Sequence, residues 1–154
     1  MGSAIEKSIE VEVPVRTAYN QWTQFEEFPQ FMEGVREVRQ LDDTHLRWRA
    51  NVGGVEKTWE AEITEQIPDA RIAWHNVSGA KNAGVVTFHR LGDDRTKIML
   101  QMEYEPEGLI ENAGDFIGVA SLRIKSDLER FKEFIESRGH ETGGWRGGVR
   151  QSHT

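Results

Sequence analysis

The chain has 154 residues, 37% of them hydrophobic and 29% charged, which suits one folded domain with a sizeable core. Its formal net charge of −7 argues against a nucleic-acid backbone or an anionic membrane as the main partner. It contains no cysteine, which excludes disulfides, thiolate metal ligands and a cysteine nucleophile. The sequence shows no signal-peptide pattern and no run long enough to span a membrane, so we expect a cytoplasmic location.

The first segment, residues 5–13, alternates between apolar and polar positions, which predicts a half-buried strand that ends at Pro14. Residues 15–24 then predict a short helix. Residues 25–32 form a compact aromatic turn or a second short helix, because Pro29 disfavours one continuous helix through both segments.

Six further segments have the alternation of strands and are separated by turn residues. They cover residues 35–41, 45–52, 55–67, 71–77, 84–91 and 95–104. Gly53-Gly54 and Gly92-Asp93-Asp94 predict tight hairpins, so the sheet should be antiparallel. Each strand has one apolar face, which indicates that only one face of the sheet is covered.

The last long segment, residues 109–138, carries apolar residues at steps of three or four and predicts one amphipathic helix with Gly139 as its C-cap. Its first half has small residues and its second half has Leu128, Phe131 and Ile135. This difference predicts a gap at one end of the helix and tight packing at the other. We expect a single domain over residues 1–140, followed by a Gly- and Arg-rich tail, 141–154, that is mobile or packs only locally.

These elements predict an α+β fold in which a curved antiparallel sheet of about seven strands wraps round the long helix. The sequence resembles the helix-grip fold of the START-like (SRPBCC) superfamily, most closely the polyketide cyclase/dehydrase and ubiquinone-binding START-domain family. The resemblance extends over most of the chain and is carried by residues 11–15, 18–22, 28–32, 59–66, 72–74, 84–88 and 127–132.

The resemblance implies an apolar cavity between sheet and helix, and the alternation of the strands independently places bulky residues on one face. The ligand-binding residues predicted from the sheet are Trp48, Trp59, Trp74, Phe88, Leu100 and Met102, and those from the helix are Ala113 and Ile117. The tryptophans have core packing as an equal alternative. Arg90 is predicted to orient a polar ligand group, with a position at the open rim of the sheet as the alternative.

The favoured function is therefore binding or carriage of a hydrophobic small molecule such as a lipid, quinone or polyketide, with no cofactor. The alternative is a polyketide aromatase/cyclase or dehydratase, for which Arg90, Tyr104 and Asn76 are the inward polar candidates. The catalytic residues stay unassigned. His45, His75 and His89 are expected to point outward, and no histidine spacing predicts a metal site.

A structural dimer module is a third interpretation, with a possible homodimer as partner, because the outer sheet face is acidic and such a sheet leaves exposed edges. The loops over residues 51–55 and 78–82 are expected to gate the entrance of the cavity, since both contain glycine.

Overall fold

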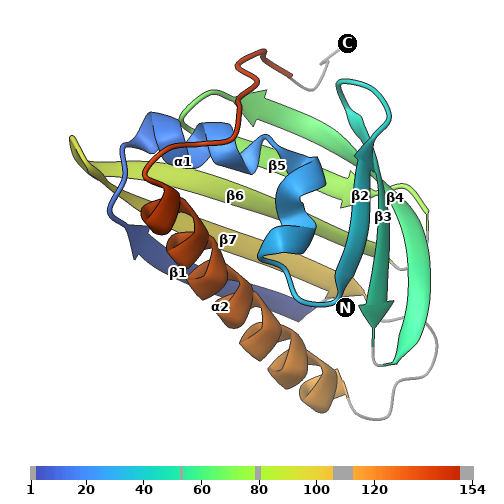
Figure 1. Ribbon diagram of the computed structural model, residues 1–154. Coiled ribbons are helices and arrows are strands. Elements are labelled where there is room, and N and C mark those ends of the chain that lie inside the picture. The colour runs from blue at the N-terminus through green and yellow to red at the C-terminus, as the bar shows by residue number, and fades with distance from the viewer. Residues whose placement is uncertain (1–2, 53, 79–80, 106–112, 150–154) are drawn as a thin grey trace.

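The structure is a computed structural model and describes residues 3–52, 54–78, 81–105 and 113–149. Its elements are β1 (Ser3–Val11), α1 (Val15–Trp22), the 3-10 helix η1 (Phe25–Gln30), β2 (Val35–Gln40), β3 (His45–Val52), β4 (Val55–Ile67), β5 (Arg71–Asn76), β6 (Lys81–Gly92), β7 (Arg95–Glu105) and α2 (Ala113–Arg138). Figure 1 shows one curved sheet with α2, α1 and η1 gathered on the same side. The predicted helix-grip α+β fold is confirmed.

The seven strands form a single sheet in the order β1-β7-β6-β5-β4-β3-β2, and every pairing is antiparallel. Hairpin connections give this order directly from β2 to β7, while β1 returns to pair with β7. One difference from the sequence prediction concerns β6, which begins at Lys81 rather than at Gly84. The predicted start of the long helix, residues 109–112, lies outside the described residues.

The inner face of the sheet follows from the register. One row across the strands joins Ile5, Met102, Gly84, Trp74 and Ile63 on β1, β7, β6, β5 and β4. Ile5 and Ile63 are buried in the hydrophobic core, so the whole row faces α2 and α1. Side chains one residue away in each strand face the opposite, outer side.

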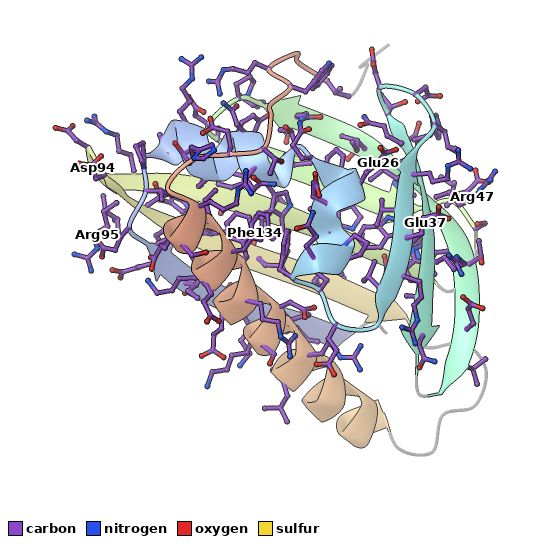
Figure 2. The ribbon with its side chains drawn as sticks, viewed as in Figure 1. Glu26, Glu37, Arg47, Asp94, Arg95 and Phe134 are labelled. Carbon is purple, nitrogen blue, oxygen red and sulfur yellow. The ribbon has the colours of Figure 1, made fainter. Side chains whose placement is uncertain are left out.

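The tightly packed part of the core lies under the second half of α2. Phe131 is fully buried, and its ring meets Trp22 of α1 at 5.0 Å and Phe31 at 5.2 Å between centroids. Phe134, labelled in Figure 2, lies beside this cluster with its ring 5.4 Å from Phe31. The contacts of Phe131 with Trp22 and Phe31 are edge-to-face, a geometry that is favourable beyond the burial of the rings. Ile135 is also fully buried, so the predicted tight packing at this end of α2 is confirmed.

The segment after Gly139 packs against α1 as a strap, which we define as residues 140–149. Asn20 donates to Glu141 at 3.0 Å, and Gln21 exchanges hydrogen bonds with Thr142 at 2.8 and 3.1 Å. At its end, Val149 pairs with Gln66 of β4 through two backbone hydrogen bonds. The prediction that the tail is mobile or packs only locally is therefore wrong for residues 141–149. The strap packs mainly through polar pairs, so its sequence has no hydrophobic periodicity that would indicate this packing.

Two glycines allow the strap to lie this close. A Cβ on Gly144 would stand 2.7 Å from Cγ of Asn20, and one on Gly143 would stand 2.8 Å from Oε1 of Gln24. Asn20, Gln21 and Thr23 are buried polar residues of α1 and its C-cap, and the strap provides their hydrogen-bond partners.

Candidate ligand-binding face of the sheet

Two tryptophans stand side by side on the inner face. Trp48 of β3 lies directly opposite Trp59 of β4, and their rings are parallel within 6° with centroids 5.9 Å apart. Directly opposed side chains in an antiparallel pair are close enough for such stacking. Phe28 of η1 also contacts Trp48, with ring centroids 5.6 Å apart. Both tryptophans are only partly buried, so together they form a flat aromatic wall that is not closed off by the core.

Trp74 forms a second aromatic surface on the same face. It lies over Gly84 of β6, where an added Cβ would be 2.5 Å from ring atom Cζ2 of Trp74 and 2.8 Å from Sδ of Met102. The missing side chain of Gly84 thus lets Trp74 and Met102 meet across β6. Both are partly buried and pack at the margin of the core.

The predicted sheet residues separate into two groups. Phe88 is 5% exposed and its ring contacts Tyr19 at 5.3 Å and Trp22 at 6.3 Å, so it belongs to the packed core. Leu100 is also buried. Trp48, Trp59, Trp74 and Met102 stay partly exposed on the inner face.

The partly exposed group gathers at one end of the sheet. Trp74 and Met102 share a row near the end of β7, and Trp48 faces Trp59 in the half of β4 that comes first in the chain. The first residues of α2 lie at this end of the sheet (Figure 1). Ala113 and Ile117 belong to that part of α2, but their side chains, like that of Tyr104, lie outside the described residues.

Arg90 does not face the tryptophans. Its side chain is 63% exposed and forms an ion pair with Asp93 in the turn between β6 and β7. Its partner in the register is Thr96, whose buried hydroxyl donates to the carbonyl of Val13 at 2.9 Å. The placement of Arg90 as a ligand-orienting residue is therefore corrected to the alternative, a position at the rim of the sheet. Asn76 is partly buried on the inner face.

The histidines of β3 and β5 lie on the outer face, as expected. His45 and His75 both approach Glu62, at 3.7 and 3.2 Å, and a hydrogen bond to Asp42 raises the pKa of His45. Within the described ranges, no three His, Asp or Glu side chains are grouped so that they could hold a metal ion. Charged pairs such as Arg49 with Glu37 and Arg47 with Glu60 cover the outer face nearby (Figure 2).

A polar cluster that the sequence analysis missed ties α2 to the turn between η1 and β2. Asp127 of α2 is 16% exposed and accepts hydrogen bonds at 3.2 Å from the backbone N–H of Glu33 and from Arg130. Arg130 also binds the Glu33 carboxylate at 2.6 Å. Burial is the largest influence on Asp127 and raises its pKa to about 6, despite these donors and the nearby Arg123.

This cluster reaches the turn between β3 and β4. Arg123 donates to the carbonyl of Glu33 at 3.0 Å, and the carbonyl of the next residue, Gly34, accepts from the backbone N–H of Asn51 at 2.7 Å. We call Glu33, Gly34, Arg123, Asp127 and Arg130 the α2 clasp. The i,i+3 spacing of Asp127 and Arg130 is visible in the sequence, but their partner Glu33 is 94 residues away from Asp127.

An antiparallel sheet curved round a C-terminal helix, with an aromatic inner face, defines a START-like helix-grip protein. Residues 11–133 match the family described as polyketide cyclase / dehydrase and lipid transport. An uncharacterised 17.2 kDa protein of Streptomyces lincolnensis is 62% identical over 148 residues, which are 96% of this chain and 99% of that protein. The chain therefore belongs to the polyketide cyclase / dehydrase and lipid transport family.

Solved structures show the same fold. A START superfamily protein from Mycobacterium smegmatis superposes with a TM-score of 0.80 at 15% identity, over 88% of this chain and 98% of that one. The Zhui aromatase/cyclase from Streptomyces sp. R1128 gives 0.79 at 16% identity, over 94% of this chain and 100% of that one. A protein from Deinococcus radiodurans is 26% identical with a TM-score of 0.69, over 89% of this chain and 99% of that one.

Proposed function

We propose that this protein binds or carries a hydrophobic small molecule, such as a lipid, quinone or polyketide, against the inner face of its sheet. The observation that carries this proposal is the partial exposure of Trp48, Trp59, Trp74 and Met102 on the inner face, next to a buried core that includes Phe88 and Leu100. An aromatic face with few charged groups favours apolar ligands. Ala113 and Ile117 of α2 are proposed to complete the site from the helix side.

The proposed ligand needs no covalent chemistry and no cofactor. The residues that contact it supply apolar surface, and the stacked Trp48–Trp59 pair offers a flat ring face. The partners in this proposal do not include nucleic acid. Among the described helices, none is long and apolar enough to cross a membrane. The cytoplasmic location remains a prediction.

A fluorescence titration with an apolar probe such as 1-anilinonaphthalene-8-sulfonate tests this function, with a fatty acid and an aromatic polyketide as competitors. We expect saturable probe binding that the competitors displace, and at least a tenfold weaker affinity in Trp74→Ala. Trp145→Ala is the matched control, because Trp145 lies in the strap and its variant should bind the probe normally. Equal affinity in Trp74→Ala and wild type, with both folded, would count against this site.

Polyketide cyclisation is a second candidate, because the family description names cyclases and the fold matches an aromatase/cyclase. With Arg90 at the rim, Asn76 is an inward polar candidate whose side chain is described, and Tyr104 stays a candidate whose side chain is not. Binding alone could then accelerate cyclisation by holding the chain in a bent form. Incubation with a model poly-β-ketone should give cyclised product that depends on Asn76 or Tyr104, and a product distribution equal to that of buffer would exclude this activity.

The two loops beside the site are proposed to gate it. In the first loop, residues 51–55, the side-chain oxygen of Asn51 accepts a hydrogen bond from Gly54 N–H at 3.0 Å. The backbone N–H of Asn51 donates to the carbonyl of Gly34, which belongs to the α2 clasp. A ligand that opened this loop should increase amide hydrogen exchange at Asn51, and unchanged exchange on ligand binding would contradict the gating role.

A further inference from the structure

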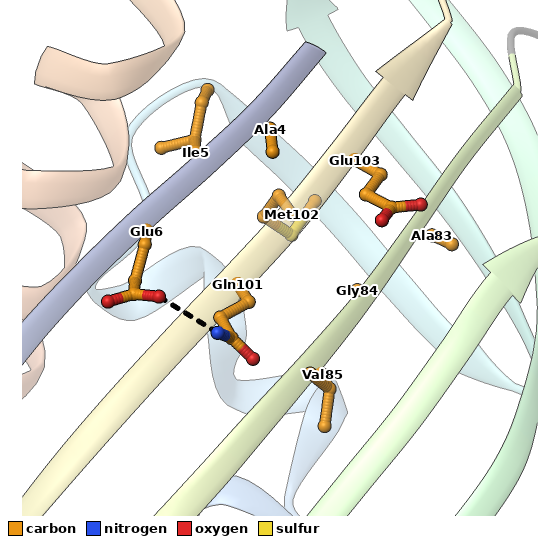
Figure 3. A pocket seen from close by; sticks show the side chains of 9 residues that line it. All are labelled: Ala4, Ile5, Glu6, Ala83, Gly84, Val85, Gln101, Met102 and Glu103. Carbon is orange, nitrogen blue, oxygen red and sulfur yellow. Dashed lines mark hydrogen bonds between the residues drawn. The ribbon is translucent and has the colours of Figure 1, made fainter. Parts of the chain in front are cut away.

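The outer face of β1, β7 and β6 contains a hollow of about 400 Å³. Six of its lining residues form two neighbouring rows that point outward: Ala4, Glu103 and Ala83 in one, and Glu6, Gln101 and Val85 in the other. Figure 3 shows these side chains, with Glu6 accepting a hydrogen bond from Gln101 at 2.8 Å. The hollow therefore lies on the side of the sheet opposite the tryptophans and is not the predicted ligand cavity.

Charge changes sign along the outward side chains of β7. From its start to its end, the strand presents Arg95, Lys97, Met99, Gln101 and Glu103. The basic end and the acidic end lie on either side of a neutral centre. Glu103 is exposed and stands between two small neighbours, Ala4 and Ala83 (Figure 3).

This pattern is complementary to itself. Consider a second copy stacked face to face on the first, related to it by a two-fold axis that runs in the interface plane, across β7 between Met99 and Gln101. Each Glu103 then faces Lys97 of the partner subunit. The Met99 side chain, flanked by Ser8 and Thr87, then points toward the hollow of the other copy. Two-fold interfaces use the same patch on both subunits, and opposite charges at matched positions fix their register.

We propose that the outer face of β1, β7 and β6 is the interface of a two-fold homodimer, with reciprocal Lys97–Glu103 pairs on either side of Met99 and Gln101 of β7. The arrangement leaves the inner faces of both subunits free, so it is compatible with ligand binding and does not depend on it. The pairs lie at a partly open surface, where salt screens charge interactions, so the dimer should weaken as ionic strength rises.

Sedimentation velocity across the micromolar range tests the interface through charge reversal. Wild type should show a concentration-dependent dimer. Lys97→Glu and Glu103→Lys each place like charges in contact twice, so each should weaken the dimer at least tenfold. The double variant Lys97→Glu/Glu103→Lys restores opposite charges and should recover most of the association.

Matched controls separate the interface from a general effect of net charge. Lys125 and Glu129 are exposed on α2, so Lys125→Glu and Glu129→Lys change the net charge equally at a distant surface and should leave the dimer intact. Circular dichroism confirms that each variant is folded, which matters for Lys97→Glu because Glu10 lies directly opposite Lys97. A wild type that stays monomeric at every concentration, or a folded double variant that associates no better than the single variants, would overturn the proposal.

Discussion

Trp74 reaches Met102 across β6 because the residue between them in the sheet is Gly84. A methyl group at this position would lie 2.5 Å from the Trp74 ring and 2.8 Å from the Met102 sulfur, which is well inside van der Waals contact. The Trp74 surface of the proposed site therefore depends on one absent side chain.

Gly84→Ala should consequently destabilise the protein by about 1–3 kcal/mol, because an added methyl in a packed site displaces rigid neighbours. Urea unfolding provides the measurement. Gly92→Ala is the matched control in the same strand, since no atom lies within 4 Å of its Cβ position. The loss should shrink when Trp74→Ala is combined with Gly84→Ala, and strictly additive losses would contradict the contact.

The α2 clasp should make stability depend on pH through Asp127. Its pKa is raised from 3.8 to about 6 in the folded protein, mainly by burial. Between pH 3.8 and about 6, the folded protein therefore keeps Asp127 protonated, whereas the unfolded chain has already released this proton. The contribution of this proton binding to the free energy of unfolding is fully present below pH 3.8 and is lost as the pH rises through about 6.

The comparison of wild type with Asp127→Asn isolates this effect, because Asn does not titrate. The unfolding free energy of wild type minus that of the variant should fall by about 1–3 kcal/mol between pH 4 and pH 7. Glu129→Gln, an exposed position on the same helix, should show a much smaller change. A difference that stays constant with pH would mean that Asp127 titrates normally in the folded state.

The strap should stabilise the domain through Arg146. Its guanidinium donates to Asn20 and to Asp69, both at 2.7 Å, and lies 5.7 Å from the centre of the Tyr19 ring. Arg146→Ala should cost about 1–2 kcal/mol, since it leaves the buried amide of Asn20 without one partner. Thermal unfolding measures the loss, and Arg16→Ala at an exposed position of α1 is the control. An equal effect of both variants would argue against a structural role for the strap.

Much of the fold was predictable because alternation and turn residues are local signals. The inward positions of Trp48 and Trp74 follow from a period of two within one strand. Arg90 fits the same pattern, yet it lies where the pairing of β6 and β7 is interrupted by an irregularity before Gly92. Its ion pair with Asp93 keeps it at the rim, and alternation alone does not reveal such an interruption.

The strap and the α2 clasp could not be predicted, because both depend on polar contacts between distant parts of the chain. Arg146 and Asn20 are 126 residues apart, and Asp127 and Glu33 are 94 apart. The polar residues Asn20, Gln21 and Thr23 on an otherwise apolar face of α1 are the one sequence signal that something polar covers that face.

The partly exposed tryptophans of the inner face are proposed to bind a hydrophobic small molecule. Native mass spectrometry of the purified protein, followed by organic extraction of what it carries, tests this most directly. We expect a discrete added mass that extracts as an apolar compound and is lost in Trp74→Ala but retained in Trp145→Ala. A protein that carries no such mass and takes up no lipid, quinone or aromatic polyketide when these are added would contradict it.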